Sequence, residues 1–506
     1  MNEIDLNWKR FWDLAVDWGW VVIIALLPIT SVPLIATLVG SSSVAAPSGL
    51  VIVVFVVVWL VPYILRGGSF PKQVLPLLGF VAAALFAAAF ASFLPIPPFN
   101  DINFFRHTVQ AYVTLGIGVS FYLVASTYPS TSARLTLTLR LVNWGGAAII
   151  LWSMILVTSW YTLHEYPEWI NNIQGVLSIS DLGKYKQRIS GFAAEPSWLA
   201  HQLNMLYLPL WLASSVRRYS VHRFRFLGFT FENLLLVSGC FILFLTYSRV
   251  GLLTFLLMLG YLMLKVSFRF INWLQTKTLR QWYDAMETSL NKWIRLLISM
   301  LILLLMLAIF LALLYAVALS LSQVDPRMEE VFQFDIGGED ALLRYGQRLE
   351  FGPRLVYWMA GWEVFGEYPW LGVGLGNAGY FFQEKISPYG WNLMEVREMV
   401  YRSGNLINIK NLWIRILAET GVIGFSFFAT WLYVIYRSAR MLEKYSQPRI
   451  QVIGLAGIFV IIGLIAEGFS VDTFALPYYW ITLGLTTVTS RHVMINSLTS
   501  AQKSME

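Results

Sequence analysis

Two arginines beside membrane-length apolar runs are candidates for chemistry on an anionic group. Arg249 stands in the short polar stretch 246–251 between two such runs, and Arg354 stands in the long polar interval 321–410. A guanidinium presents N–H donors in a fixed fork and can hold phosphate oxygens with two bonds. An ionisable residue at a membrane edge is a functional candidate by default. The alternative for Arg249 is an arginine that only anchors a helix end at the interface.

Glu195 is the candidate proton acceptor. It lies in Gly-Phe-Ala-Ala-Glu-Pro-Ser, residues 191–197, where a second polar interval, 161–197, ends at an apolar run. A carboxylate is already in its basic form at neutral pH and can take a proton from a hydroxyl. The alternative is a carboxylate that only complements the dipole of the helix that Pro196 would start. His201 is a candidate substrate contact, but it lies on another face of that helix, so it is not expected to pair with Glu195.

Aromatic side chains accompany Arg354 on a predicted helix. Pro353 suits the first turn of a helix, and Arg354, Trp358 and Trp362 then share one face. The helix is too short and too polar to span a membrane, so we expect it to lie along the surface, with its tryptophans available to a sugar or a lipid. The glycines that follow predict a tight backbone bend rather than a dinucleotide site; they are Gly372, Gly374 and Gly376.

No metal and no cofactor is expected. The 5 histidines are scattered along the chain, and the acidic residues form no ligand-like cluster. There is also no Ser-His-Asp order and no phosphate-cradling loop of a specific type. The available chemistry is therefore arginines for an anionic group, a carboxylate or lysine for a proton, and aromatic rings for sugar or lipid. That set suits a metal-independent transfer in which a pyrophosphate leaves and a hydroxyl attacks.

An all-α, polytopic membrane protein is predicted to hold these residues. Of the 506 residues, 57% are hydrophobic and 13% are charged, whereas about a quarter of a soluble domain is charged. Apolar runs of about 20 residues indicate membrane-spanning helices. Twelve transmembrane helices are predicted, over residues 18–39, 44–65, 74–94, 108–126, 141–160, 198–216, 229–247, 250–266, 295–320, 411–436, 452–469 and 474–490.

The lysines and arginines between these spans predict the orientation. Most fall in alternate loops, which places those loops and both termini in the cytoplasm, and the net charge of +7 therefore does not point to nucleic acid. The intervals 161–197 and 321–410 are then outside. Segment 267–293, with interleaved basic and aromatic residues, is predicted to be an inside amphipathic helix against the membrane. The predicted organisation is nine helices over 1–320, the large loop 321–410, and three helices and a tail over 411–506.

Three stretches resemble motifs of the O-antigen ligase and O-antigen polymerase superfamily of bacterial membrane glycosyltransferases. Residues 246–251 resemble its Thr-x-Ser-Arg-x-Gly turn, and residues 354–377 resemble its Arg…Trp…Pro-x-x-Gly-x-Gly-x-Asn block. Residues 411–424, from Asn-Leu-Trp to Glu-Thr-Gly-Val-Ile-Gly, resemble the segment that re-enters the membrane after the large loop. The predicted layout, with that loop before the tenth span, fits as well.

The resemblance implies a GT-C-like helical fold and transfer of a glycan from an undecaprenyl-pyrophosphate donor. It assigns the family's two arginines to Arg249 and Arg354. Ligases of the family typically have His-Asn where this chain has Lys410-Asn411. We therefore assign Lys410 and Asn411 to substrate binding and Glu195 to catalysis. The 191–197 stretch is similar to exopolysaccharide polymerases of the superfamily, which favours polymerisation of lipid-linked repeat units into O-antigen or exopolysaccharide.

Two other functions stay open at this point. One is a ligase that joins the glycan to lipid A core or to protein. The other is a transporter, although carriers built from two six-span halves usually have their main loop in the middle. The expected location is the bacterial inner membrane, with the active site on the periplasmic side. The expected partners are the lipid-linked glycan donor and acceptor, membrane lipids, and flippase and chain-length regulator proteins. The sequence does not specify the sugars, the linkage or the oligomeric state.

Overall fold

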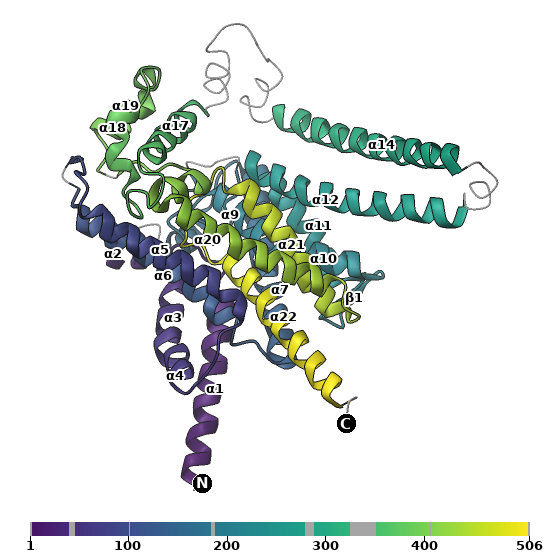
Figure 1. Cartoon of the computed structure of the whole chain (residues 1–506). Helices are drawn as coiled ribbons and strands as arrows, with labels where there is room; N and C mark the ends of the chain where they lie inside the picture. The colour runs from purple at the N-terminus through teal and green to yellow at the C-terminus, as the bar shows by residue number, and fades with distance from the viewer. Residues whose placement is uncertain are drawn as a thin grey trace. The chain divides into compact units, whose positions relative to one another are not determined.

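The chain is almost entirely helical in a computed structural model that describes residues 3–39, 46–100, 102–183, 188–278, 288–323, 351–404 and 406–503. Figure 1 shows its course from the purple N-terminal helix to the yellow C-terminal helix. The chain divides into two compact units. One unit is Met1–Gly251 with Pro353–Glu506, and the other is Leu252–Gly352. Of the predicted large loop 321–410, residues 324–350 lie outside the described residues.

The N-terminal part of the chain is a series of helices with short connections. Side-chain caps begin two of them, because the oxygens of Asn103 and Thr131 accept the backbone N–H groups of Arg106 and Arg134. The segments are α1 (Glu3–Ala25), α2 (Pro33–Val39), α3 (Pro47–Phe55), η1 (Val56–Leu60), α4 (Val61–Leu65), η2 (Lys72–Val74), α5 (Leu75–Ala91), α6 (Phe104–Ala125), α7 (Ser132–Leu163) and α8 (Glu168–Leu177).

The middle of the chain contains one long helical stretch, a hairpin and three further helices. The stretch is formed by α9 (Pro196–Gln202), η3 (Leu203–Tyr207) and α10 (Leu208–Arg217). The strands β1 (Arg225–Phe226) and β2 (Phe229–Thr230) pair antiparallel, with Arg225 opposite Thr230. After them come α11 (Phe231–Leu245), α12 (Arg249–Trp273), η4 (Leu274–Thr278) and α14 (Thr288–Ser322).

The C-terminal part packs against earlier helices of the same unit. Helix α20 lies against α5 and α21, α21 lies against α10, and α22 lies against α6. Contacts between elements so distant in sequence hold the first unit together. The segments of this part are α17 (Gly352–Glu367), η6 (Ala378–Phe381), α18 (Phe382–Lys385), η7 (Gly390–Asn392), α19 (Met394–Tyr401), α20 (Leu412–Glu443), α21 (Pro448–Glu467) and α22 (Tyr478–Lys503).

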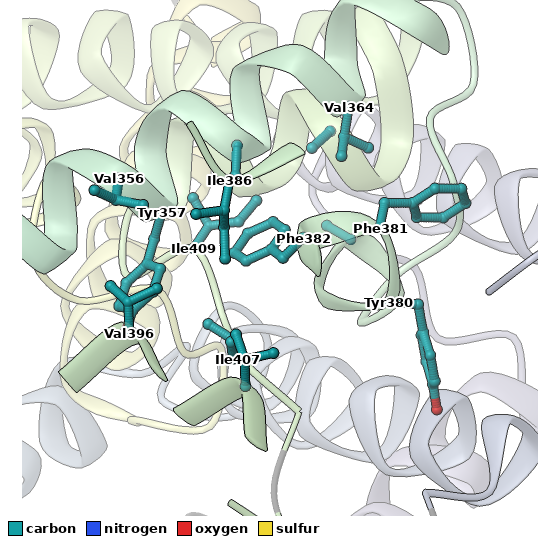
Figure 2. Packing of buried hydrophobic residues seen from close by; sticks show 14 of the residues in the cluster. Val356, Tyr357, Val364, Tyr380, Phe381, Phe382, Ile386, Val396, Ile407 and Ile409 are labelled. Carbon is teal, nitrogen blue, oxygen red and sulfur yellow. The ribbon is translucent and has the colours of Figure 1, made fainter. Parts of the chain in front are cut away.

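The segment between α17 and α20 has a hydrophobic core of its own. Figure 2 shows side chains of α17 meeting those of the later short helices and of the segment before α20. Burying these side chains fixes α17, and with it Arg354, relative to the start of α20. The buried residues include Val356, Tyr357, Val364, Phe381, Phe382, Ile386, Val396, Ile407 and Ile409.

Eight helices among the described residues are long and apolar enough to cross a membrane. This confirms the prediction of an all-α, multi-pass membrane protein, but twelve spans are not shown. The eight are Pro47–Leu65, Lys72–Ala91, Phe104–Ala125, Ser132–Leu163, Arg249–Lys277, Asn291–Ser320, Leu412–Glu443 and Pro448–Glu467.

The other predicted spans fall on helices outside that set. The span predicted over 18–39 is divided, because α1 ends at Ala25 and α2 begins at Pro33. Prolines lack the N–H that continues a helix, and two of them, Pro28 and Pro33, lie in or at this break. The spans predicted over 198–216, 229–247 and 474–490 correspond to the α9–α10 stretch, to α11 and to the first half of α22.

The helix that contains the predicted span 250–266 is longer than that span. Helix α12 continues through Trp273, and η4 extends the helical stretch to Thr278. No proline or glycine occurs between Gly260 and Thr278, so the helix propagates past the predicted end. The first part of the predicted inside helix, 267–293, is therefore a continuation of α12. Residues 279–287 lie outside the described part of the chain.

Candidate active site

The turn that carries Arg249 is held by its own hydroxyl groups. The Thr246 Oγ1 donates to the Leu243 C=O at 2.7 Å and accepts the Ser248 N–H at 3.2 Å. The Ser248 Oγ accepts the Gly251 N–H at 3.3 Å, and α12 starts at Arg249. Tyr247 adopts a positive φ of 46°, which a non-glycine residue takes only when its surroundings impose it. The half-buried Arg249 thus projects from a rigid first turn.

Arg354, in the first turn of α17, is held by the turn that follows α21. Its Nη1 donates to the Ser470 Oγ at 2.5 Å and to the Ser470 C=O at 3.5 Å. Burial lowers the pKa of the Arg354 guanidinium, and the negative charges of nearby Asp472, Glu395 and Glu195 act in the opposite direction. Arg354 is therefore a partly buried cation surrounded by carboxylates from three different segments.

Lys410 lies beside the same turn. Its backbone N–H donates to the Asp472 Oδ2 at 2.9 Å, which holds the residue at a positive φ of 52°. Its Nζ lies 3.5 Å from the Glu395 Oε1 and 5.5 Å from the centre of the Tyr357 ring. The Trp358 Nε1 donates to the Lys410 C=O at 3.4 Å. The structure thus brings Lys410 and Trp358 together and places Lys410 and Arg354 around one short turn.

Asn411 and the second tryptophan have different surroundings. The Asn411 Oδ1 accepts the backbone N–H groups of Trp413 and Ile414 at 3.0 and 3.1 Å, so this buried side chain caps α20. Trp362 is 55% exposed and packs against Phe365. Its exposed ring is available to a ligand, whereas the Asn411 oxygen already has two partners. The assignment of Asn411 and Trp362 to substrate binding stays a prediction.

Glu195, the N-cap residue of α9, and His201, within α9, have side chains in separate environments. Glu195 occupies the N-cap position of α9, but its side chain makes no capping bond to the backbone. It is exposed, and its Oε2 accepts the Ser197 hydroxyl at 3.1 Å. His201 is 2% exposed, and its Nδ1 lies 2.5 Å from the Glu467 Oε2. As predicted, His201 does not pair with Glu195; its role as a substrate contact stays a prediction.

Several polar residues at this site were missed by the sequence analysis. Arg415 is bonded to Glu419 at 2.9 Å, and its Nη1 donates to the Asp472 C=O at 2.5 Å. In the sequence, Ser470 and Asp472 can be recognised only as residues of a short loop. Arg415 and Glu419, four residues apart in an apolar helix, did give a detectable signal. Charged side chains inside a membrane are energetically costly, so they are rare and usually have a role.

The predicted glycine bend is present and interlocks with α20. Gly372, Gly374 and Gly376 have φ values of 68°, 85° and 85°, which favour glycine. The Val373 N–H donates to the Ala418 C=O at 3.0 Å. Gly421, inside α20, has a φ of 64°, and the Val422 N–H donates to the Pro369 C=O at 2.8 Å. The bend therefore fixes the end of α17 against the kink of α20.

Among the residues that the structure describes, no group of three or more His, Cys, Asp or Glu side chains could hold a metal ion. The carboxylates near Arg354 and Lys410, which include Asp472 and Glu395, lie beside these cations instead. Metal independence of the reaction stays a prediction.

The comparison with known families finds a match over the central part of the chain. Residues 234–429 match the family model described as O-antigen ligase, which covers Arg249, Arg354 and Lys410 but not Glu195. A search of the curated proteins finds no match. Over residues 234–429, this multi-pass membrane protein is therefore similar to the O-antigen ligase family, whose enzymes are membrane glycosyltransferases.

Proposed function

We propose that this protein polymerises undecaprenyl-pyrophosphate-linked oligosaccharide repeat units into O-antigen or exopolysaccharide at the outer face of the bacterial inner membrane. A growing lipid-linked chain is the donor, and the terminal sugar of another lipid-linked repeat unit is the acceptor. The acceptor hydroxyl oxygen forms a bond to the anomeric carbon, and the bond from that carbon to the pyrophosphate oxygen breaks. Undecaprenyl pyrophosphate leaves with both electrons of that bond.

The gathering of cations around the turn after α21 carries this proposal. The Arg354 side chain bonds Ser470, and the Lys410 backbone N–H bonds Asp472, so both residues are attached to the same turn. A leaving pyrophosphate gains negative charge, and fixed cations stabilise that charge without reorganising. Arg249 supplies the second guanidinium fork, and Lys410 supplies a further contact to the pyrophosphate. These side chains do the work that a bound divalent cation does elsewhere.

Glu195 is the proton acceptor in this mechanism. The acceptor hydroxyl must lose its proton as its oxygen attacks, and a general base within reach of that proton accelerates the step. Glu195 is exposed to an incoming ligand and close enough to Arg354 to influence its ionisation. A carboxylate with no capping bond to the backbone can move toward a substrate hydroxyl.

Trp358 and Trp362 are assigned to the binding of the sugar or lipid portions of the substrates.

The ligase alternative is favoured by the description of the matching family and is disfavoured by Lys410, which stands where ligases typically have histidine. The transporter alternative has no support in this match.

Mass analysis of lipid-linked glycans from cells with and without the protein tests the proposal. Loss of a polymerase should cause single repeat units on undecaprenyl pyrophosphate to accumulate. Loss of a ligase should instead cause finished polymer to accumulate on the same lipid. The second pattern, or no change in lipid-linked glycans, would contradict polymerisation.

A further inference from the structure

We propose that Asn204 and Glu467, supported by His201, are positioning residues that hold the elements carrying Arg249 and Arg354 in fixed register. None of the three acts on substrate in this role; each acts through the arginines. The inference rests on the proposed function, because it requires both arginines to bind one pyrophosphate. It concerns residues more than 260 positions apart in the chain, which the fold places in contact.

The first link joins α9–α10 to the Arg249 turn. Asn204 is fully buried, and its Nδ2 donates to the Gly251 C=O at 2.8 Å. Gly251 lies two residues after Arg249, in the first turn of α12. A Cβ atom on Gly251 would lie 2.6 Å from the Ala200 Cβ. The two backbones therefore approach closely here, and this brings the Gly251 carbonyl within reach of Asn204.

The second link joins Asn204 to the turn that holds Arg354. The same Asn204 Nδ2 donates to the Glu467 Oε1 at 2.8 Å. Glu467 is the last residue of α21, and its C=O accepts the N–H groups of Ser470 and Val471, both at 2.8 Å. The Ser470 Oγ then accepts the Arg354 Nη1 at 2.5 Å. One asparagine amide thus connects the backbone beside Arg249 to the side chain that holds Arg354.

His201 completes the link by fixing the other carboxylate oxygen. Its Nδ1 lies 2.5 Å from the Glu467 Oε2, and the two side chains are 2% and 3% exposed. A buried carboxylate is costly unless its oxygens are bonded. With one oxygen held by Asn204 and the other by His201, the Glu467 side chain cannot rotate. The α21 end is therefore fixed relative to α9 in position and in direction.

This arrangement matters because two adjacent phosphates set the separation that two guanidinium groups must have. Displacing a binding group by about 1 Å can reduce turnover by about 100-fold. The two arginines lie 105 positions apart in the chain, so local structure alone cannot fix their separation. A buried connection of hydrogen bonds between the elements can.

Asn204→Ala tests the inference against Gln202→Ala. Gln202 is a matched control, because it is a buried amide on the same helical stretch that donates to the Leu27 and Pro28 carbonyls and to the Tyr478 hydroxyl. Asn204→Ala should lower kcat for polymerisation by about 10- to 100-fold with a smaller change in KM. Inorganic pyrophosphate should also raise the melting temperature of the purified variant by less than it raises that of the unchanged protein. Gln202→Ala should retain both properties, even with a comparable loss of melting temperature.

The inference fails if the two variants lose activity in proportion to their melting temperatures, or if Asn204→Ala keeps full activity. Should Asn204→Ala not fold, Ser470→Ala removes only the hydroxyl at the end of the link and should lower kcat as well, while Ser470→Thr should restore it. Ser92→Ala, which removes a hydroxyl that bonds the Ala88 C=O within its own helix end, is the control. Full activity of Ser470→Ala would also overturn the inference.

Arg249→Lys and Arg354→Lys test the proposed function separately, since full activity of both variants would show that the arginines take no part in the mechanism.

Discussion

Glu195 and Glu467 are both carboxylates at the end of a helix, and their surroundings give them different tasks. Glu195 is exposed and accepts a hydrogen bond from the Ser197 hydroxyl. Glu467 is buried, with its oxygens bonded to Asn204 and His201. A side chain that exchanges a proton with a substrate must be reachable, and a side chain that holds two elements together must not move. Only Glu195 meets the first condition, so we assign proton transfer to it.

Glu195→Gln should therefore lower kcat by about two to four orders of magnitude, because glutamine keeps the size of the side chain but cannot accept the proton. Binding of the lipid-linked donor should persist. Steady-state polymerisation and donor binding by the purified protein measure the two effects. Glu168→Gln, at an exposed position in the first turn of α8, is the control and should be active. If Glu195→Gln polymerises normally and Lys410→Ala does not, Lys410 is the better candidate for the base.

Arg249→Lys and Arg354→Lys should each lower turnover while the protein stays folded. Lysine keeps the positive charge but loses the fork of N–H donors that holds two oxygens. At Arg354 the lysine also loses the geometry of the bond to Ser470. Polymerisation rate and melting temperature, measured together, separate a catalytic effect from unfolding. Arg106→Lys, at an exposed arginine near the start of α6, should change neither quantity.

The sequence could indicate the arginines and Glu195 but not the residues that hold them. Arg249 and Arg354 occur in recognisable local patterns, and the predicted helix after Pro353 is present as α17. Ser470, Asp472 and Asn204 have no local pattern, because their importance comes from contacts made across the fold. Glu467 did give a signal, since a carboxylate at the end of an apolar span is unusual, and that signal was not used.

At the scale of elements, the sequence predicts a backbone bend reliably where glycines allow positive φ values. It does not predict whether a proline kinks a helix or ends it. The bend at Gly372–Gly376 was predicted from three glycines and is present with positive φ values. Proline inside a predicted span can kink a helix or end it. Around Pro28 the helix ends, at Ala25, and the next begins at Pro33. Tertiary packing decides between those outcomes, and sequence spacing does not report it.

The interlock between the glycine bend and α20 predicts a strong effect of Gly421→Ala. A Cβ atom there would lie 2.1 Å from the Trp370 carbonyl oxygen, and the φ of 64° disfavours a side chain. We expect a loss of about 2 kcal/mol or more in stability, together with loss of activity, because α17 would shift. Thermal unfolding in detergent measures the first effect. Gly366→Ala is the control: no atom lies within 4 Å of its Cβ position, so alanine should be tolerated within α17.

At the scale of the whole molecule, the orientation in the membrane is the main prediction that the fold leaves to experiment. Positively charged loops predict that residues 161–197 and 321–410 lie outside and that both termini lie inside. Gly175→Cys and Gly404→Cys, at open positions in the two outer intervals, should react with an impermeant thiol reagent in intact cells. Lys444→Cys should react only after lysis. The background is Cys240→Ser, which removes the single native cysteine. The reverse labelling pattern would overturn the orientation.

The distribution of charge over the molecule also predicts that activity survives chelation. Arg354, Lys410 and Arg415 all bond residues of the turn after α21, and no metal-binding group of three side chains is found among the described residues. The leaving pyrophosphate is therefore expected to be neutralised by side chains. Polymerisation by purified protein should be unchanged in EDTA. Loss of polymerisation that magnesium or manganese restores would show that a metal ion takes part.

Helix α11 has one consequence for the lipid around it. Its 15 residues rise only about 22 Å, whereas the hydrocarbon layer of a bilayer is about 30 Å thick. A helix too short for its bilayer creates hydrophobic mismatch, and the surrounding lipid thins to match it. Arg249 follows the end of α11 after a turn of only three residues, 246–248. The membrane is therefore expected to be thinnest beside Arg249. A pyrophosphate carried on a polyprenyl chain would have the shortest distance to move there, from the headgroup level of the membrane to the enzyme.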